Sequence, residues 1–216
     1  MKLVIFDLDG TLADSIESIT YCGNYALKQA GLRTFEREDY QYFVGDGVVS
    51  LVSRMVKAAG DEKLKSFDLV KKEYDKIFEE YCMYEVRPYP GIVELLEQLK
   101  QRNLLVAVLS NKPHARTIDV IHALFGEHVF DAIQGQQDGM LKKPSPEGVF
   151  EIAKQLEVDP SEILYLGDTD TDMKTGKSAG AYTLGVLWGF RKRDELIENG
   201  ADAIIENPLD ALLYLG

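Results

Sequence analysis

The stretch Leu3-Val4-Ile5-Phe6-Asp7-Leu8-Asp9-Gly10-Thr11 decides how the rest of the chain is interpreted. Its first four residues are apolar and include two β-branched side chains, which favours a short strand buried on both faces. Two carboxylates and a glycine follow directly. We therefore expect the central strand of a parallel sheet, with Asp7 and Asp9 at its C-terminal end.

The two aspartates are separated by one residue. If the extended backbone continues, both carboxylates point the same way, about 6–7 Å apart, and two like charges at that distance favour a bound cation. Gly10 permits a tight turn, and Thr11 offers a hydroxyl and an amide to an anion. An ordinary turn at a strand end is the alternative interpretation.

Residues 14–84 carry helical patterns and no strand signal. The expected helices run from 14 or 15 to 30 and over 37–43, 47–59 and 66–81. Two prolines and a glycine within residues 86–91 then indicate a linker. We expect an inserted all-helical cap domain over residues 15–84 and a catalytic core formed by residues 1–14 and 85–216.

Beyond the linker, strands alternate with helices, which is typical of a parallel sheet with crossover helices. Helices are expected over 92–101, 115–124, 146–156 and 172–179, and strands over 104–109, 132–134, 163–166, 182–187 and 203–205. The predicted fold class is therefore α/β, with a doubly wound, Rossmann-like parallel sheet as the core.

The amino-acid composition limits which molecules and surfaces the chain is expected to bind. The 216 residues include 24 Lys and Arg against 36 Asp and Glu, a net charge of −12, which disfavours binding to nucleic acid or to an anionic membrane surface. Cys22 and Cys82 are too few for a disulfide framework and indicate free thiols in a reducing compartment. No secretion signal or membrane span is recognised, so we expect a cytoplasmic protein, either a monomer or a homodimer.

Three further polar clusters follow predicted strands or lie in a stiff loop. Ser110, Asn111 and Lys112 follow the strand over 104–109, and Asp168 and Asp172 follow the strand over 163–166. Lys143 lies beside two prolines that restrict the loop. Ligands of open parallel sheets bind outside the carboxyl ends of the strands, so these side chains are expected to converge. Singly, each cluster is also compatible with a solvated loop or with acids at a helix N-terminus.

An oxygen-rich acidic cluster favours Mg²⁺ over Zn²⁺. A lysine held rigidly opposite such a cluster places a positive charge where a phosphate group could bind. The conjunction of the four clusters therefore indicates phosphate chemistry more strongly than any one of them.

The motifs Asp7-Leu8-Asp9-Gly10-Thr11, Ser110, Lys143 and Gly167-Asp168-x-x-x-Asp172 resemble, in order and spacing, the four motifs of the haloacid dehalogenase-like phosphatase superfamily. Within it the chain is similar to the phosphoglycolate phosphatase group. That narrower likeness rests on Asp14-Ser15, Val44-Gly45-Asp46-Gly47-Val48 with Arg54, Asn111-Lys112-Pro113, Lys143-Pro144-Ser145-Pro146, the stretch from Gly176 to Gly180, and Gly185-Val186-Leu187-Trp188-Gly189.

The resemblance implies a mechanism. Asp7 is the nucleophile that forms an aspartyl phosphate, Asp9 is the general acid and then the general base, and Lys143 and Ser110 complete the catalytic set. A Mg²⁺ ion is expected on Asp7, Asp9, Asp168 and Asp172. The substrate is expected to be a small anionic phosphate ester, with 2-phosphoglycolate favoured, and the expected substrate-binding residues are Thr11, Asn111, Gly45, Asp46, Gly47 and Arg54.

Other activities stay open. A sugar phosphomutase of the same superfamily shares Asp7 and Asp9, a pyrophosphatase would use the same acidic site, and a non-enzymatic phospho-acceptor domain also carries acids and a lysine. A dehalogenase is less favoured because that reaction needs neither Asp9 nor Mg²⁺.

Overall fold

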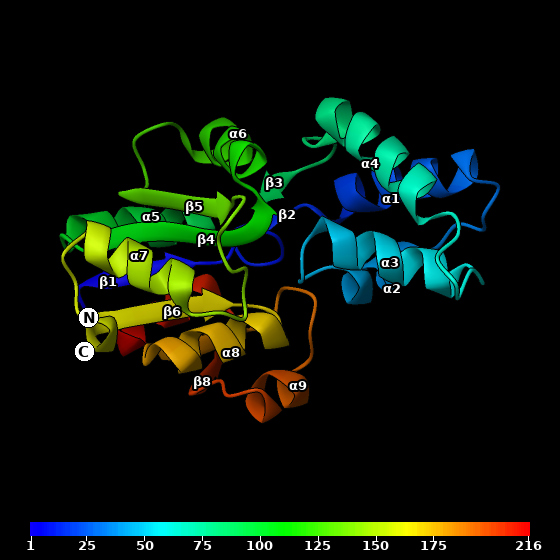
Figure 1. Cartoon of the computed structure of the whole chain (residues 1–216). Coiled ribbons are helices and arrows are strands. Elements are labelled where there is room, and N and C mark those ends of the chain that lie inside the picture. The colour runs from blue at the N-terminus through cyan, green and yellow to red at the C-terminus, as the bar shows by residue number, and fades with distance from the viewer. The chain divides into compact units, whose positions relative to one another are not determined.

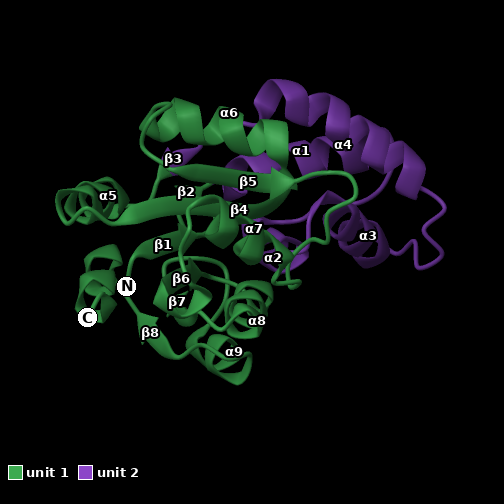
Figure 2. Cartoon of the chain, turned by 60° about the vertical axis from the view of Figure 1, so that its left-hand side comes forward, with its two compact units in different colours: residues 1–14, 88–216 green, residues 15–87 purple.

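The computed structural model describes residues 1–216, which form two compact units. Unit 1 comprises residues 1–14 and 88–216, and unit 2 comprises residues 15–87, as coloured in Figure 2. The second boundary falls between residues 87 and 88, whereas the sequence pattern places it between 84 and 85. A two-stranded sheet pairs β2 (Ala13–Asp14) with β3 (Arg87–Pro88), where the chain leaves and re-enters unit 1.

Unit 1 is built on a six-stranded parallel sheet in the order β5-β4-β1-β6-β7-β8. β1 lies in the middle, with Leu3 opposite Leu105 of β4 on one side and Ile163 of β6 on the other. The strand order reverses at β1, so its carboxyl end is the switch point of the sheet. The doubly wound fold is thus confirmed. The strands are β1 (Leu3–Phe6), β4 (Leu105–Pro113), β5 (Ala132–Gln136), β6 (Ile163–Gly167), β7 (Tyr182–Val186) and β8 (Ala203–Ile205).

Helices cover both faces of this sheet. In Figure 1, α7 and α8 lie in front of it and α5 lies behind it. The sequence pattern misses α9 and two 3₁₀ segments, because their lengths of 6, 3 and 7 residues are too short to show a helical period. The segments are α5 (Ile92–Gln101), α6 (His114–Phe125), α7 (Glu147–Gln155), α8 (Asp170–Ala179), α9 (Arg193–Glu198), and the 3₁₀ helices η1 (Pro160–Glu162) and η2 (Pro208–Tyr214).

The core explains why β1 is apolar without interruption. All four residues of β1 are fully buried, and alternate side chains of a strand point to opposite faces. Leu3 and Ile5 belong to one cluster with Val149 and Ile152 of α7 and with Tyr165 of β6. A strand covered on both faces has no position for a polar residue until it ends.

Unit 2 contains four helices, α1 (Ile16–Gln29), α2 (Arg37–Phe43), α3 (Val48–Ala58) and α4 (Phe67–Tyr81). Its interior holds Tyr40, which is fully buried and whose hydroxyl donates a hydrogen bond to Asn24 Oδ1 at 3.1 Å. Cys22 and Cys82 are buried and are not joined in a disulfide. No helix of the chain combines the length and the apolar character that crossing a membrane requires.

Close contact between α8 and β7 gives a stability prediction. A Cβ at Gly176 would overlap the Thr183 hydroxyl, although alanine is otherwise the better helix former by about 1 kcal/mol. Overpacking costs about 1–3 kcal/mol, so after the gain in helix propensity we expect Gly176→Ala to lower the free energy of unfolding by up to about 2 kcal/mol in urea titrations. The exposed Ser178→Ala on the same helix should stay within about 0.5 kcal/mol of the parent. A stabilised Gly176→Ala variant would contradict this account of the contact.

Candidate functional site

Polar groups from four distant segments of unit 1 meet at the carboxyl end of β1. At their centre is the Lys143 ammonium, whose Nζ donates to Asp7 Oδ1 at 2.6 Å, Asp172 Oδ1 at 2.7 Å and the Leu109 carbonyl at 3.0 Å. The Lys143 side chain is only 3% exposed. All three ammonium donors are therefore used, which fixes where this charge lies. This convergence is the arrangement that the sequence predicts.

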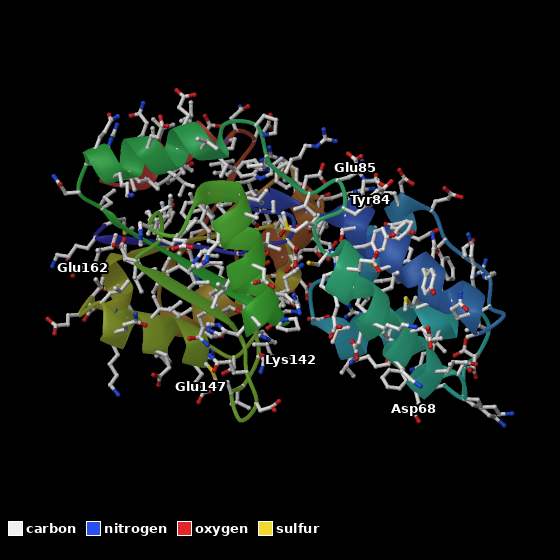
Figure 3. The ribbon with its side chains drawn as sticks, turned by 90° about the horizontal axis from the view of Figure 1, so that it is seen from above. Asp68, Tyr84, Glu85, Lys142, Glu147 and Glu162 are labelled. Carbon is white, nitrogen blue, oxygen red and sulfur yellow. The ribbon has the colours of Figure 1, made fainter.

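Asn111 holds the lysine loop in place. Its Oδ1 accepts from the Lys143 amide at 2.9 Å, and its Nδ2 donates to the Lys143 carbonyl at 3.1 Å. This pair of hydrogen bonds joins the end of β4 to the loop before α7. Neighbouring Lys142 is exposed, and Figure 3 shows it at the opposite end of unit 1 from Glu162.

Three buried carboxylates form an acidic group at this point. Oxygen atoms of Asp7, Asp168 and Asp172 all lie within 4.8 Å of one another. Asp168 accepts from the Thr11 hydroxyl at 3.0 Å and from the Phe190 amide at 2.8 Å. Thr11, expected to contact substrate, thus directs its hydroxyl to Asp168.

Asp172 accepts more hydrogen bonds from the protein than its neighbours do, with two donors on each of its oxygens. Oδ1 accepts from Lys143 and, at 3.2 Å, from the Tyr165 hydroxyl. Oδ2 accepts from the Thr169 amide at 3.1 Å and from its hydroxyl at 2.6 Å. A carboxylate has about four acceptor positions, so little capacity is left on Asp172. On Asp7, by contrast, the protein donates only to Oδ1.

The backbone turns sharply after β1. The strand ends at Phe6, and the Leu8 carbonyl accepts hydrogen bonds from the amides of Thr11, Leu12 and Ala13 at 3.3, 3.0 and 2.9 Å. The extended geometry that would align Asp7 with Asp9 is therefore not kept. Gly10 has φ +96°, and a Cβ there would overlap the Asp168 carboxylate, so the turn requires glycine for both reasons.

Asp9 stands apart from the acidic group. Both of its oxygens accept from Lys112 Nζ, at 2.9 and 3.0 Å, and no oxygen of its side chain joins the cluster of the other three carboxylates. Ser110, the neighbouring predicted residue, is 4% exposed, and its Oγ accepts from the Lys112 amide at 3.2 Å. The sequence places Lys112 in a polar stretch at the end of β4 but does not predict its contact with Asp9.

The loop after β7 closes another side of the site. Trp188 Nε1 donates to the Thr11 carbonyl at 2.9 Å, and the Phe190 amide binds Asp168. Between them, Gly189 lies so close to Asp168 and the Gly10 carbonyl that a Cβ would overlap both. Trp188 and Gly189 belong to one of the motifs recognised in the sequence, but the contacts of this loop with Thr11 and Asp168 were not predicted.

Three of the four predicted residues of unit 2, Gly45, Asp46 and Gly47, form one loop, and the fourth, Arg54, lies on α3 and binds that loop. Gly45 and Gly47 both have positive φ, +115° and +81°, and α3 begins directly after Gly47. The Arg54 guanidinium donates to the carbonyls of Phe43 and Val44, at 3.0 and 3.3 Å, and forms an ion pair with Asp46. Arg54 is therefore engaged with the loop that precedes its own helix.

Burial and mutual repulsion dominate the electrostatics. Burial raises the pKa of Asp7 to about 7, with Asp172 and Asp9 adding to the rise and Lys143 opposing it. Burial also raises the pKa of Asp168 well above its usual value, and the charges of Asp7 and Asp172 add to this. Burial alone would lower the pKa of Lys143, but Asp172 and Asp7 raise it well above normal. The lysine stays charged, whereas the carboxylates lack sufficient positive charge.

The donor set fits a divalent hard cation. Asp7, Asp9, Asp168 and Asp172 with Lys112 and Lys143 leave a net formal charge of −2. All candidate ligands are oxygens, which Mg²⁺ prefers, and no cysteine or histidine belongs to the group. A dication would balance the charge of the site and offset the burial and the repulsion that raise the two pKa values.

Comparisons with known proteins agree with this geometry. A family model described as haloacid dehalogenase-like hydrolase matches residues 4–186. A phosphoglycolate phosphatase from Aquifex aeolicus is 32% identical over 214 residues, covering 97% of this chain and 94% of the relative. A phosphoglycolate phosphatase from Nitrosospira multiformis is 28% identical over 214 residues, covering 98% and 94%.

A solved structure also matches the fold over the whole chain. The crystal structure of a predicted phosphoglycolate phosphatase from Haemophilus somnus superposes with a TM-score of 0.92 at 28% sequence identity, covering all of this chain and 98% of that one. The family model and this superposition both cover the strands that carry Asp7, Ser110 and Asp168. The chain therefore belongs to the haloacid dehalogenase-like hydrolase family.

Proposed function

We propose that this chain is a Mg²⁺-dependent phosphatase that hydrolyses a small anionic phosphate monoester, with 2-phosphoglycolate the favoured substrate. The observation that carries the proposal is the buried Lys143 ammonium between Asp7 and Asp172, beside the third carboxylate of Asp168. Such a site combines a nucleophile, cation ligands and a fixed positive charge. The names of the Aquifex and Nitrosospira relatives support the choice of substrate.

Asp7 is the proposed nucleophile. Lys143 holds its Oδ1, while Oδ2 accepts no hydrogen bond from the protein. A carboxylate that approaches a phosphate dianion meets repulsion of about 4 kcal/mol per charge pair at 4 Å and an effective dielectric near 20. Mg²⁺ on Asp7 and Asp168, with the backbone carbonyl of Asp9, would supply the positive charge that offsets this repulsion. Asp172, saturated by protein donors, would orient Lys143.

The chemical step has two halves. Asp7 attacks phosphorus as the ester P–O bond breaks, and Asp9 donates a proton to the departing oxygen, which leaves an alcohol and an aspartyl phosphate. Asp9 then takes a proton from water, whose oxygen attacks the phosphorus, releases inorganic phosphate and restores Asp7. Lys143 keeps its proton throughout.

Ser110 and the loop of unit 2 are the proposed substrate contacts. The Ser110 hydroxyl accepts from the Lys112 amide and donates to no protein acceptor, so its proton is available for a phosphoryl oxygen.

The loop of Gly45, Asp46 and Gly47 precedes the N-terminus of α3, whose backbone amides suit a substrate carboxylate. Arg54 holds this loop through two carbonyls and Asp46, and we propose that it acts on the substrate together with the loop. Asn111 contributes by fixing the Lys143 backbone.

A panel of monoesters assayed with Mg²⁺ and with chelator tests the proposal. We expect turnover of 2-phosphoglycolate above sugar phosphates, nucleotides and pyrophosphate, and loss of turnover with chelator. Asp7→Asn and Asp9→Asn should each lose at least about 100-fold in kcat, because each removes a group that takes part in the reaction. The exposed Lys142→Met is the matched control for Lys143→Met and should keep parental activity.

The rival activities give different results in the same panel. Phosphate that migrates within a sugar bisphosphate cycle would indicate a mutase, and preference for pyrophosphate would indicate a pyrophosphatase. A single phosphorylation event without turnover would indicate a phospho-acceptor domain. Parental activity in Asp7→Asn would remove that residue from the nucleophile role.

Mg²⁺ binding gives a second prediction, which needs no substrate. Because the pKa of Asp7 is raised to about 7 in the folded protein, the metal-free protein loses stability from this group as pH rises from about 4 through 7. Mg²⁺ competes with that proton, so binding strengthens over the same range. We expect Mg²⁺ to raise the melting temperature more at about pH 8 than at about pH 5.

Asp7→Asn is the control for this measurement. It removes the titrating carboxylate and should shrink the Mg²⁺-induced shift at the higher pH. A shift of equal size at both pH values in the parent protein would contradict the proposed ligand role of Asp7.

A further inference from the structure

Lys112 is a second buried lysine at the site, and none of the roles above uses its ammonium group. Its side chain is 5% exposed, and its Nζ contacts both oxygens of Asp9, whose side chain is 20% exposed. A lysine is almost never buried to this degree unless it is paired. The pairing is specific, since Lys143 serves Asp7 and Asp172 while Lys112 serves Asp9.

The fold places Lys112 through an irregular strand end. The pairing of β4 with β5 shifts register between Leu109 and Pro113, and such irregularities redirect side chains at sites. The Lys112 amide donates to Ser110 Oγ at 3.2 Å, and its carbonyl accepts from the Thr117 hydroxyl at 3.2 Å. A Cβ at Gly135 of β5 would overlap this same carbonyl and the Thr117 hydroxyl. The backbone that carries Lys112 is thus fixed on both sides.

Asp9 lies nearer the surface of the site than the three clustered carboxylates, so its orientation depends on how it is held. It follows the turn after β1, and its side chain is more exposed than those of Asp7 and Asp172. One ammonium between both carboxylate oxygens opposes rotation of the group about its bond to Cβ. A reacting group displaced by about 1 Å can lose about 100-fold in rate, so this restraint has a measurable consequence.

We propose that Lys112 is a positioning residue that holds the Asp9 carboxylate in the orientation for proton transfer. This inference rests on the proposed function of Asp9. Lys112 acts through Asp9, so its removal should lower kcat and leave KM nearly unchanged. We expect a loss of about 10- to 100-fold for Lys112→Met with an alkyl phosphate.

Substrates whose leaving groups differ in basicity distinguish a misplaced Asp9 carboxylate from a general disruption of the site. Nitrophenolate departs without a proton, so Lys112→Met should still release one equivalent of it rapidly from p-nitrophenyl phosphate. Slow turnover should follow, because the aspartyl phosphate then waits for water activated by Asp9. An alkyl phosphate should show no such burst. Such a burst would show that Asp7 and Lys143 still carry out the first half of the reaction in the variant.

Three further variants make the test complete. In an Asp9→Asn background, Lys112→Met should lower kcat by less than about twofold, because coupled residues are not additive. Lys177→Met is the matched control, since Lys177 also pairs with an aspartate, Asp202 at 3.1 Å, but is 61% exposed. It should behave as the parent. Lys112→Gln retains an amide group that can donate to Asp9 and should lose less activity than Lys112→Met.

The outcomes distinguish this inference from the proposed function. If Asp9→Asn keeps parental activity, the proposed role of Asp9 fails, and the inference fails with it. If Asp9→Asn is inactive while Lys112→Met turns over alkyl phosphates at the parental rate, only the inference is overturned. A rise in KM at constant kcat, loss of the nitrophenolate burst, or full additivity with Asp9→Asn would also overturn it, because each assigns Lys112 to substrate binding or to folding.

Discussion

The structure depends on keeping several carboxylates close together inside a low-dielectric site. Asp7, Asp168 and Asp172 have oxygens within 4.8 Å of one another, and such a group is unstable unless positive charge is fixed beside it. Lys143 supplies part of this charge through two ion pairs and a carbonyl contact. The remaining deficit is what a dication would balance. The acidic group is therefore costly for the metal-free fold and suited to holding a dication.

The sheet makes this concentration of charge possible. β1 lies between β4 and β6 and is fully buried, so the first polar residue after it emerges at the switch point. Glycines then allow close approach of the surrounding backbone. Gly10 and Gly189 both lie against Asp168, where any side chain would collide with the carboxylate. The Phe190 amide and the Thr11 hydroxyl reach Asp168 for this reason.

Much of this arrangement could be predicted from the sequence, because apolar runs that end in acids mark strands at a switch point. The alternation of strands and helices gave the parallel sheet, and the spacing of Asp7, Lys143, Asp168 and Asp172 gave the convergence. The partners of each group could not be predicted, since hydrogen bonds over more than 100 residues leave no local pattern. Lys112 on Asp9 and the Trp188–Phe190 loop are examples. The role of Asn111 in fixing Lys143 was likewise invisible.

Direct detection of the phosphorylated residue tests the central claim most directly. The protein with Mg²⁺ and 2-phosphoglycolate is quenched in acid within the first turnover, digested, and its peptides are examined by mass spectrometry. The account predicts one phosphoryl group on the N-terminal peptide, located at Asp7. A phosphoryl group on another side chain, or rapid hydrolysis during which no phosphorylated peptide forms, would contradict it.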